Sequence, residues 1–191
     1  MNTYIALLRA VNVGGYGKLP MASFRKVLEE LGYHNVETYI QSGNAVFDAP
    51  GTAPRTCAAI ATSLEKLTKA PVGVLLRTHD DLGRIIDQNP YAAEAAADGA
   101  RVHAVFLSKA APPEVAKGLD RIVTQYPARR DRFHVVGDTL YLHVPEGAAE
   151  TKFQAKTIDR ILGVTSTARN WNTVLKLHAM SDRGKSQKAG A

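Results

Sequence analysis

The chain has 191 residues, of which 45% are hydrophobic and 22% charged, and its formal net charge is +6 at pH 7. This length fits one sizeable domain or two small ones, and the composition excludes a largely disordered protein. Residues 4–8 form the only apolar run near the N-terminus, too short for a signal-peptide core or a membrane span, and the single cysteine, Cys57, excludes an internal disulfide, so we expect a cytoplasmic protein without a membrane segment.

The first half predicts the element order β-α-β-β-α-β with one additional helix. Residues 3–9 are apolar on both alternating sides, as in a central strand that is covered on both faces. Two β-rich runs separated by Ser42-Gly43 predict a tight hairpin. The expected segments are, in order, a strand at 3–9, a glycine loop at 14–17, a helix at 20–31, strands at 35–41 and 44–48, a helix at 54–67, a strand at 72–77 and a helix that opens at Thr78 and stops before Asn89-Pro90.

The second half repeats this order. It predicts a strand at 102–107, a helix at 112–123, a hairpin of 133–136 with 139–144 across Gly137-Asp138, a helix begun by a capping box at Thr151 and Gln154, a short strand and a last helix from Asn170. The predicted fold class is α+β, with two ferredoxin-like (β-α-β-β-α-β) halves forming one compact two-subdomain protein. Residues 1–90 are the expected first half, 100–181 the second half, and 182–191 a disordered basic tail.

Phosphate-loop and dinucleotide motifs are absent around the glycine loop. A Walker A spacing would put Asn12 in place of its first glycine and Leu19 in place of its hydroxyl residue, and Pro20 stands where a dinucleotide loop needs a third glycine. A looser anion site made by the loop amides and Lys18 is one interpretation, and a plain strand-to-helix turn is the other. The six histidines lack metal-ligand spacing, so we expect no metal site and no cofactor.

The strands of the second half carry several histidines. If the apolar residues Ala104, Phe106, Phe133, Val135, Leu140 and Leu142 face the helices, alternation sends Arg101, His103, His134, Tyr141 and His143 to the opposite face. That face either binds a ligand or is an ordinary polar surface.

Basic residues are concentrated in the second half of the sequence. Residues 1–99 carry 9 Lys and Arg against 10 Asp and Glu, whereas residues 100–191 carry 15 against 8. This asymmetry is typical of proteins that bind phosphate groups, although basic surfaces that are only solvated are also common. The basic side chains that could follow a phosphate backbone are Lys152, Lys156 and Arg160 at helical spacing and Arg129, Arg130 and Arg132 before a strand.

Four separated segments resemble the signature segments of bacterial domain-of-unknown-function family 1697. They are Tyr4-Ile-Ala-Leu-Leu-Arg9, Asn12-Val-Gly-Gly15, Tyr39-Ile-Gln-Ser-Gly-Asn44 and Ala168-Arg-Asn-Trp-Asn-Thr173, with Leu140-Tyr-Leu-His-Val-Pro145 before the last. The resemblance implies a two-part α+β fold of the ferredoxin-like kind and supplies no mechanism. Tyr16-Gly17 departs from the more polar loop expected of the family.

The motif segments supply the candidate ligand-binding residues. Arginine and carboxamide groups together suit a carboxylate or a phosphate, whereas the alternative is that these residues only cap a helix and make a turn. The candidates are Arg9, Asn12, Gly14, Gly15, Lys18, Gln41, Ser42, Asn44, Arg169, Asn170, Trp171 and Asn172.

These observations favour a binding protein for an anionic partner, either a phosphorylated small molecule or single-stranded nucleic acid. One alternative is an enzyme on a small anionic metabolite, with Arg9, Lys18 and Arg169 holding charge and His143 or His103 as general acid or base. Another is a structural or interaction protein without a ligand. We expect a monomer or a small homo-oligomer.

Overall fold

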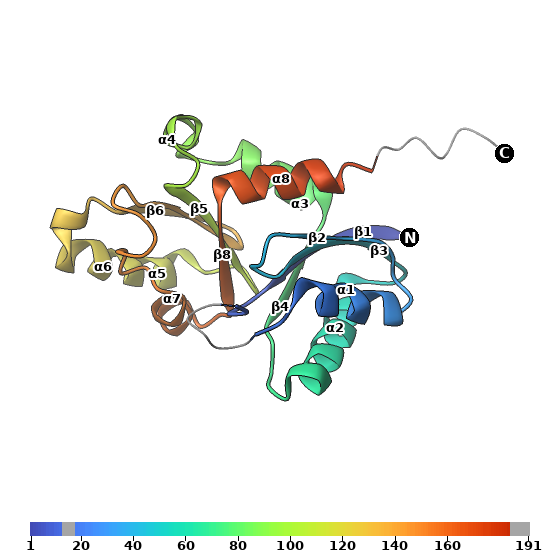
Figure 1. Cartoon of the computed structure of the whole chain (residues 1–191). Coiled ribbons are helices and arrows are strands. Elements are labelled where there is room, and N and C mark those ends of the chain that lie inside the picture. Colours follow the sequence, from blue (N-terminus) through green and yellow to red (C-terminus); the bar gives the residue numbers. More distant parts are fainter. Residues whose placement is uncertain (13–17, 184–191) are drawn as a thin grey trace. The chain divides into compact units, whose positions relative to one another are not determined.

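The computed structural model describes residues 1–12 and 18–183, and the described chain is an α+β protein with two four-stranded antiparallel sheets (Figure 1). Two compact units are formed, one by Met1–Gly83 with Lys176–Ala191 and the other by Arg84–Leu175. The sequence suggested a boundary between residues 90 and 100. The observed division lies earlier and assigns the end of the last helix to the first unit.

The first sheet has the strand order β2-β3-β1-β4. Its central strand β1 is antiparallel to both neighbours, with Ile5 opposite Val46 on one side and Arg77 on the other. Residues 4–8 of β1 are all at most 4% exposed, which confirms the predicted burial of both strand faces. The strands are β1 (Asn2–Leu8), β2 (His34–Tyr39), β3 (Asn44–Ala49) and β4 (Val74–Arg77).

Helices α1 (Met21–Glu30) and α2 (Ala53–Thr68) cover one face of this sheet (Figure 1). Apolar positions three and four apart on each helix produce the stripe that faces the strands. The core between them contains Tyr4, Ala6, Leu8, Phe24, Leu28, Phe47, Ile60 and Leu64.

The turn between β2 and β3 is longer than predicted. Tyr39 pairs directly with Asn44, so residues 40–43 form a four-residue turn instead of a tight one. Ile40 and Gly43 adopt positive φ values of 46° and 75°. The predicted turn length was wrong because Gly43 packs closely against the residues at the end of β1. A Cβ on Gly43 would lie 2.5 Å from Val11 Cγ2, so the conformation of the turn is set by this packing as well as by its own residues.

The second sheet has the equivalent order β6-β7-β5-β8. Here the hairpin is tight as predicted, because Val136 pairs with Thr139 across the two-residue turn Gly137-Asp138. The strands are β5 (Val102–Leu107), β6 (Arg132–Val136), β7 (Thr139–His143) and β8 (Ser166–Asn170).

The helices on this sheet differ from the prediction in two places. The single helix expected at 112–123 is divided into α5 (Pro113–Ala116), η1 (Lys117–Leu119) and α6 (Asp120–Gln125), followed by η2 (Pro127–Arg129). The division falls at Gly118, a weak helix former that lets Ile161 approach closely. Helix α7 (Ala155–Leu162) begins after Gln154. Thr151 does not cap it, because the helix begins later; the Thr151 hydroxyl donates to Asp131 at 2.7 Å and accepts the Phe153 amide at 3.2 Å.

Three further helices are α3 (His79–Asp87), α4 (Ala92–Ala97) and α8 (Trp171–Ser181). The predicted start of the last helix is confirmed, because Asn170 Oδ1 accepts the Thr173 amide at 3.0 Å. In the described ranges, no helix combines the length and apolar character needed to cross a membrane.

The predicted facing of β5 was wrong. Cross-strand partners share a face, and Val105 pairs with Leu140 while Ala104 pairs with Tyr141. Val105, Leu107, Leu140 and Leu142 pack in the core with α7, so His103 lies on this helix-covered face. Ala104, Phe106 and Tyr141 occupy the opposite face and are also buried, so that face is not a polar surface.

Candidate functional site

Six of the predicted site residues come together at one end of the first sheet. The link is the Asn12 carboxamide, whose Nδ2 donates to the carbonyls of Leu19 and Gln41, both at 2.8 Å, while its Oδ1 accepts the Leu19 amide at 2.8 Å. The exit of β1, the approach to α1 and the β2–β3 turn are therefore tied together. We name this group, Arg9, Asn12, Lys18, Gln41, Ser42 and Asn44, the strand-end cluster. Gly14 and Gly15 lie outside the described residues.

Several polar groups of the strand-end cluster are used inside the fold. Asn44 is fully buried and its Nδ2 donates to the Tyr39 carbonyl at 3.1 Å and to Ser42 Oγ at 2.9 Å. The Leu8 amide donates to the Gly43 carbonyl at 2.8 Å. The Asn12, Ser42 and Asn44 side chains thus hold the turn against β1.

The strand-end cluster also contains Arg9, Lys18 and Gln41, whose side chains carry the groups that suit a ligand. Arg9 is half-buried, whereas Lys18 and Gln41 are exposed. The backbone beside them is constrained, because Ala10 and Asn12 have positive φ values of 55° and 56°. Positive φ in residues other than glycine is costly and is common where a loop is shaped for a task. A guanidinium, an ammonium and a carboxamide at one strand end suit an oxyanion chemically.

The other predicted site segment, Arg169–Asn172, belongs to the second unit. Arg169 is buried, its Nη1 donates to Thr167 Oγ1 and to the Ala168 carbonyl, both at 2.8 Å, and burial lowers its pKa to about 10. Trp171 is 6% exposed and its amide donates to the Gly99 carbonyl at 3.0 Å. Asn172 contacts Gly99 so closely that a methyl group there would overlap its carboxamide. These residues build the β8–α8 junction.

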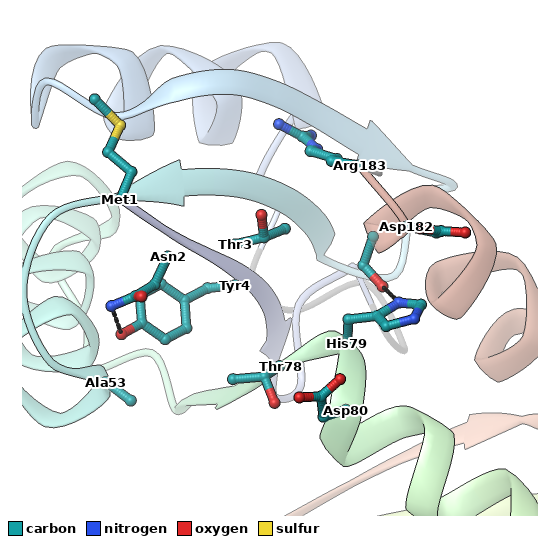
Figure 2. A pocket seen from close by; sticks show the side chains of 11 residues that line it. Met1, Asn2, Thr3, Tyr4, Ala53, Thr78, His79, Asp80, Asp182 and Arg183 are labelled. Carbon is teal, nitrogen blue, oxygen red and sulfur yellow. Dashed lines mark hydrogen bonds between the residues drawn. The ribbon is translucent and has the colours of Figure 1, made fainter. Parts of the chain in front are cut away.

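A pocket that the sequence did not predict lies at the other end of β1 (Figure 2). Its volume is about 920 Å³, and its walls come from the start of β1, the start of α3 and the last residues of α8 and beyond. His79 Nδ1 lies 3.0 Å from Ser181 Oγ, and the His79 ring stacks on His178 with centroids 4.1 Å apart. Ser181 is 3% exposed, and its hydroxyl donates to the His178 carbonyl at 2.8 Å.

The pocket could not be found by local pattern because His79 and Ser181 are 102 residues apart. The polar groups around it are largely engaged. Tyr4 Oη donates to the Gly51 carbonyl at 2.9 Å, and Arg183 Nη1 lies 3.1 Å from Asp48 Oδ2. Arg183 belongs to the tail that was expected to be disordered, and this ion pair fixes it, while residues 184–191 lie outside the described residues.

The two histidines considered as general acid or base both lie in the second unit. Burial lowers the pKa of His103 to about 4, and its Nδ1 has no hydrogen-bond partner among the described residues. His143 Nδ1 lies 3.0 Å from Arg132 Nη2, and burial together with that guanidinium lowers its pKa. Both rings are therefore held neutral at pH 7 by their surroundings.

The arginines just before β6 and at its first position are paired with carboxylates. Arg129 pairs with Glu150 at 3.2 Å, Arg130 pairs with Glu146 at 2.9 Å, and Arg132 pairs with Glu94. Lys152 Nζ lies 5.5 Å from the centre of the Tyr126 ring. Lys152, Lys156 and Arg160, the three members of the predicted basic row, are all exposed.

The division into units also redistributes the charge. The first unit contains 12 Lys and Arg against 8 Asp and Glu, and the second contains 12 against 10. The excess of basic over acidic residues is therefore smaller in the second unit, 12 against 10, than in the second half of the sequence, 15 against 8.

Comparison with known proteins gives a family and a fold. A family model described as "Protein of unknown function (DUF1697)" matches residues 1–141. The solved structure of the conserved bacterial protein SP0830 from Streptococcus pneumoniae is similar over 96% of this chain and 99% of its own, with a TM-score of 0.68 and 22% sequence identity. At that identity the likeness shows the fold alone. No curated protein matches this chain.

Proposed function

This chain belongs to the family of proteins of unknown function DUF1697, and from that premise we propose that its strand-end cluster binds a phosphorylated small molecule. The observation that carries the proposal is the Asn12 carboxamide, which ties the β2–β3 turn and the approach to α1 to the end of β1. Arg9, Lys18 and Gln41 then share one end of the sheet. A phosphate accepts hydrogen bonds from all three of these groups.

A small phosphorylated molecule is favoured over single-stranded nucleic acid. Nucleic-acid binding needs a continuous basic track and aromatic faces on which bases stack. Arg129 and Arg130 are paired with carboxylates, and the Lys152 ammonium lies 5.5 Å from the centre of the Tyr126 ring. The cluster itself offers only two cationic side chains, which suits one phosphate group.

The proposal is tested by isothermal titration with a panel of inorganic phosphate, AMP and glucose 6-phosphate. Arg9→Gln and Lys18→Gln remove one cationic donor each, and Arg25→Gln on the exposed side of α1 is the matched control. Charge-assisted hydrogen bonds contribute about 1.5–3 kcal/mol, so each cluster variant should weaken the best ligand by about tenfold or more. Equal affinity in all four proteins would contradict the proposal.

A second function has support of its own, namely that the motif residues serve folding and the protein acts without a ligand. Asn12, Asn44 and Asn170 each use their side chain in a hydrogen bond that shapes a turn or begins a helix. Under this alternative, changing those carboxamides lowers stability, and changing Arg9 and Lys18 alters nothing measurable.

We also propose that the two units are ferredoxin-like duplicates. The support is their common order of strands and helices and one detail of register. Ile5 pairs with Arg77 in the first sheet and Ala104 pairs with Arg169 in the second, and both arginines are buried with Nη1 donating to the preceding residue's carbonyl. We propose in addition that the protein is bacterial and cytoplasmic, and that it is a monomer or a small homo-oligomer.

A further inference from the structure

A groove in the second unit lies among α5, η1, α6 and α7. Its volume is about 510 Å³, a size at which small organic ligands are commonly bound. Gly118 forms part of the wall, and a Cβ there would lie 2.8 Å from Ile161 Cγ2, so the glycine allows η1 and α7 to approach closely.

Two guanidinium groups line this groove, Arg121 from α6 and Arg160 from α7. Both side chains are exposed, and within residues 1–12 and 18–183 neither has an ion-pair or hydrogen-bond partner. The nearby carboxylate of Asp159 accepts the Ser166 hydroxyl at 2.6 Å. Arg121 and Arg160 thus differ from the paired arginines before β6.

The rest of the lining includes apolar side chains. Val115 is 37% exposed, although most valines are buried, and Ile122 and Ile161 contribute further apolar surface. An inorganic anion would satisfy the arginines and leave this surface in water. A molecule with an acidic head and an apolar body would cover both.

We propose that this groove binds a small amphiphilic anion, a phosphate or carboxylate that carries an alkyl or aryl group. Arg121 and Arg160 hold the acidic head with charge-assisted hydrogen bonds. The apolar body lies against Val115 and Ile161, where burial of each methylene group adds to the affinity. The inference does not rest on the function proposed for the strand-end cluster, because the residues and the unit are different.

The test is a calorimetric titration of the full chain with hexyl phosphate, methyl phosphate and hexanol. It is made in the Arg9→Gln/Lys18→Gln background, so that phosphate bound at the strand-end cluster does not contribute. Hexyl phosphate should bind at least tenfold more tightly than methyl phosphate, and hexanol should not bind. Arg121→Gln and Arg160→Gln should each weaken hexyl phosphate by about tenfold, while Arg55→Gln, an exposed arginine of α2, should have no effect.

A second variant separates the two parts of the ligand. Val115→Thr keeps the volume of the side chain and adds a hydroxyl, so it should reduce the preference for hexyl over methyl phosphate and leave methyl phosphate unchanged. Equal affinity for the two phosphates, binding of hexanol, or no response to either arginine change would overturn the proposal. Hexyl phosphate binding that is present in the unchanged chain and lost entirely in the Arg9→Gln/Lys18→Gln background would overturn it too, and would leave the strand-end proposal standing.

Discussion

The Asn12 carboxamide makes three hydrogen bonds while its backbone holds a φ of 56°. Asparagine is one of the few residues that tolerate this backbone region, and its side chain can serve as both donor and acceptor. The sequence marked this position as polar and without an obvious core role. Its contribution to the fold depends on Leu19 and Gln41, which lie 7 and 29 residues away along the chain.

Two substitutions at Asn12 separate these roles. Asn12→Ala loses the hydrogen bonds and strains the backbone, whereas Asn12→Gly loses the bonds alone. We expect urea unfolding to show a loss of about 1–3 kcal/mol for the glycine variant and a larger loss for alanine. An alanine variant as stable as the unchanged protein would show that the three bonds contribute nothing.

His103 gives a prediction about pH. Its pKa falls from 6.5 to about 4 because burial opposes the charged ring. As the pH drops, the unfolded chain therefore binds this proton at a higher pH than the folded chain does. The free energy of unfolding is unaffected by His103 above about pH 6.5 and falls between about pH 6.5 and 4, by roughly 3 kcal/mol in total.

Replacing His103 by Leu should flatten the stability profile between these pH values, measured by urea unfolding at several pH values. His34→Gln on the exposed edge of β2 is the matched control. A His103→Leu profile as steep as that of the original protein would assign the pH dependence to other groups.

Among the elements, the two hairpins show what sequence patterns can and cannot predict. Both turns were located from glycines between β-rich runs, and the two-residue turn at Gly137 is as expected. The β2–β3 turn is longer because Gly43 is fitted against Leu8 and Val11, which precede it by more than thirty residues. No local pattern contains that contact. The divided helix at Gly118 has the same kind of cause, the closeness of α7.

The two turn glycines form a matched pair for mutation. Both have positive φ, 75° at Gly43 and 57° at Gly137, but a Cβ at Gly43 would lie 2.7 Å from Leu8 Cβ and one at Gly137 meets nothing within 4 Å. Gly137→Ala should cost about 1 kcal/mol from backbone strain, and Gly43→Ala should cost at least about 2 kcal/mol more from overlap. Thermal and urea unfolding measure both, and equal losses would refute the packing role of Gly43.

For the whole molecule, the sequence predicted the α+β class, the family and the order of the strands along the chain. Alternation and turn residues encode these features locally. The division into units, the charge of each unit and the His79–Ser181 pocket depend on which distant segments meet, and α8 contributes to both units. Of the candidate site, the motif segments located the strand-end cluster, but they did not separate Arg9, Lys18 and Gln41 from the carboxamides that hold the turn.

The central claim is that the strand-end cluster binds a phosphorylated molecule, and amide chemical shifts report on it most directly. A ¹H–¹⁵N titration of the labelled chain with the best ligand from the calorimetric panel should move the resonances of Arg9, Lys18 and Gln41 first and saturably. The same titration of the Arg9→Gln/Lys18→Gln variant should leave the amide resonances of positions 9, 18 and 41 in place. Shifts confined to residues outside the strand-end cluster, or no saturable shift at all, would contradict the account.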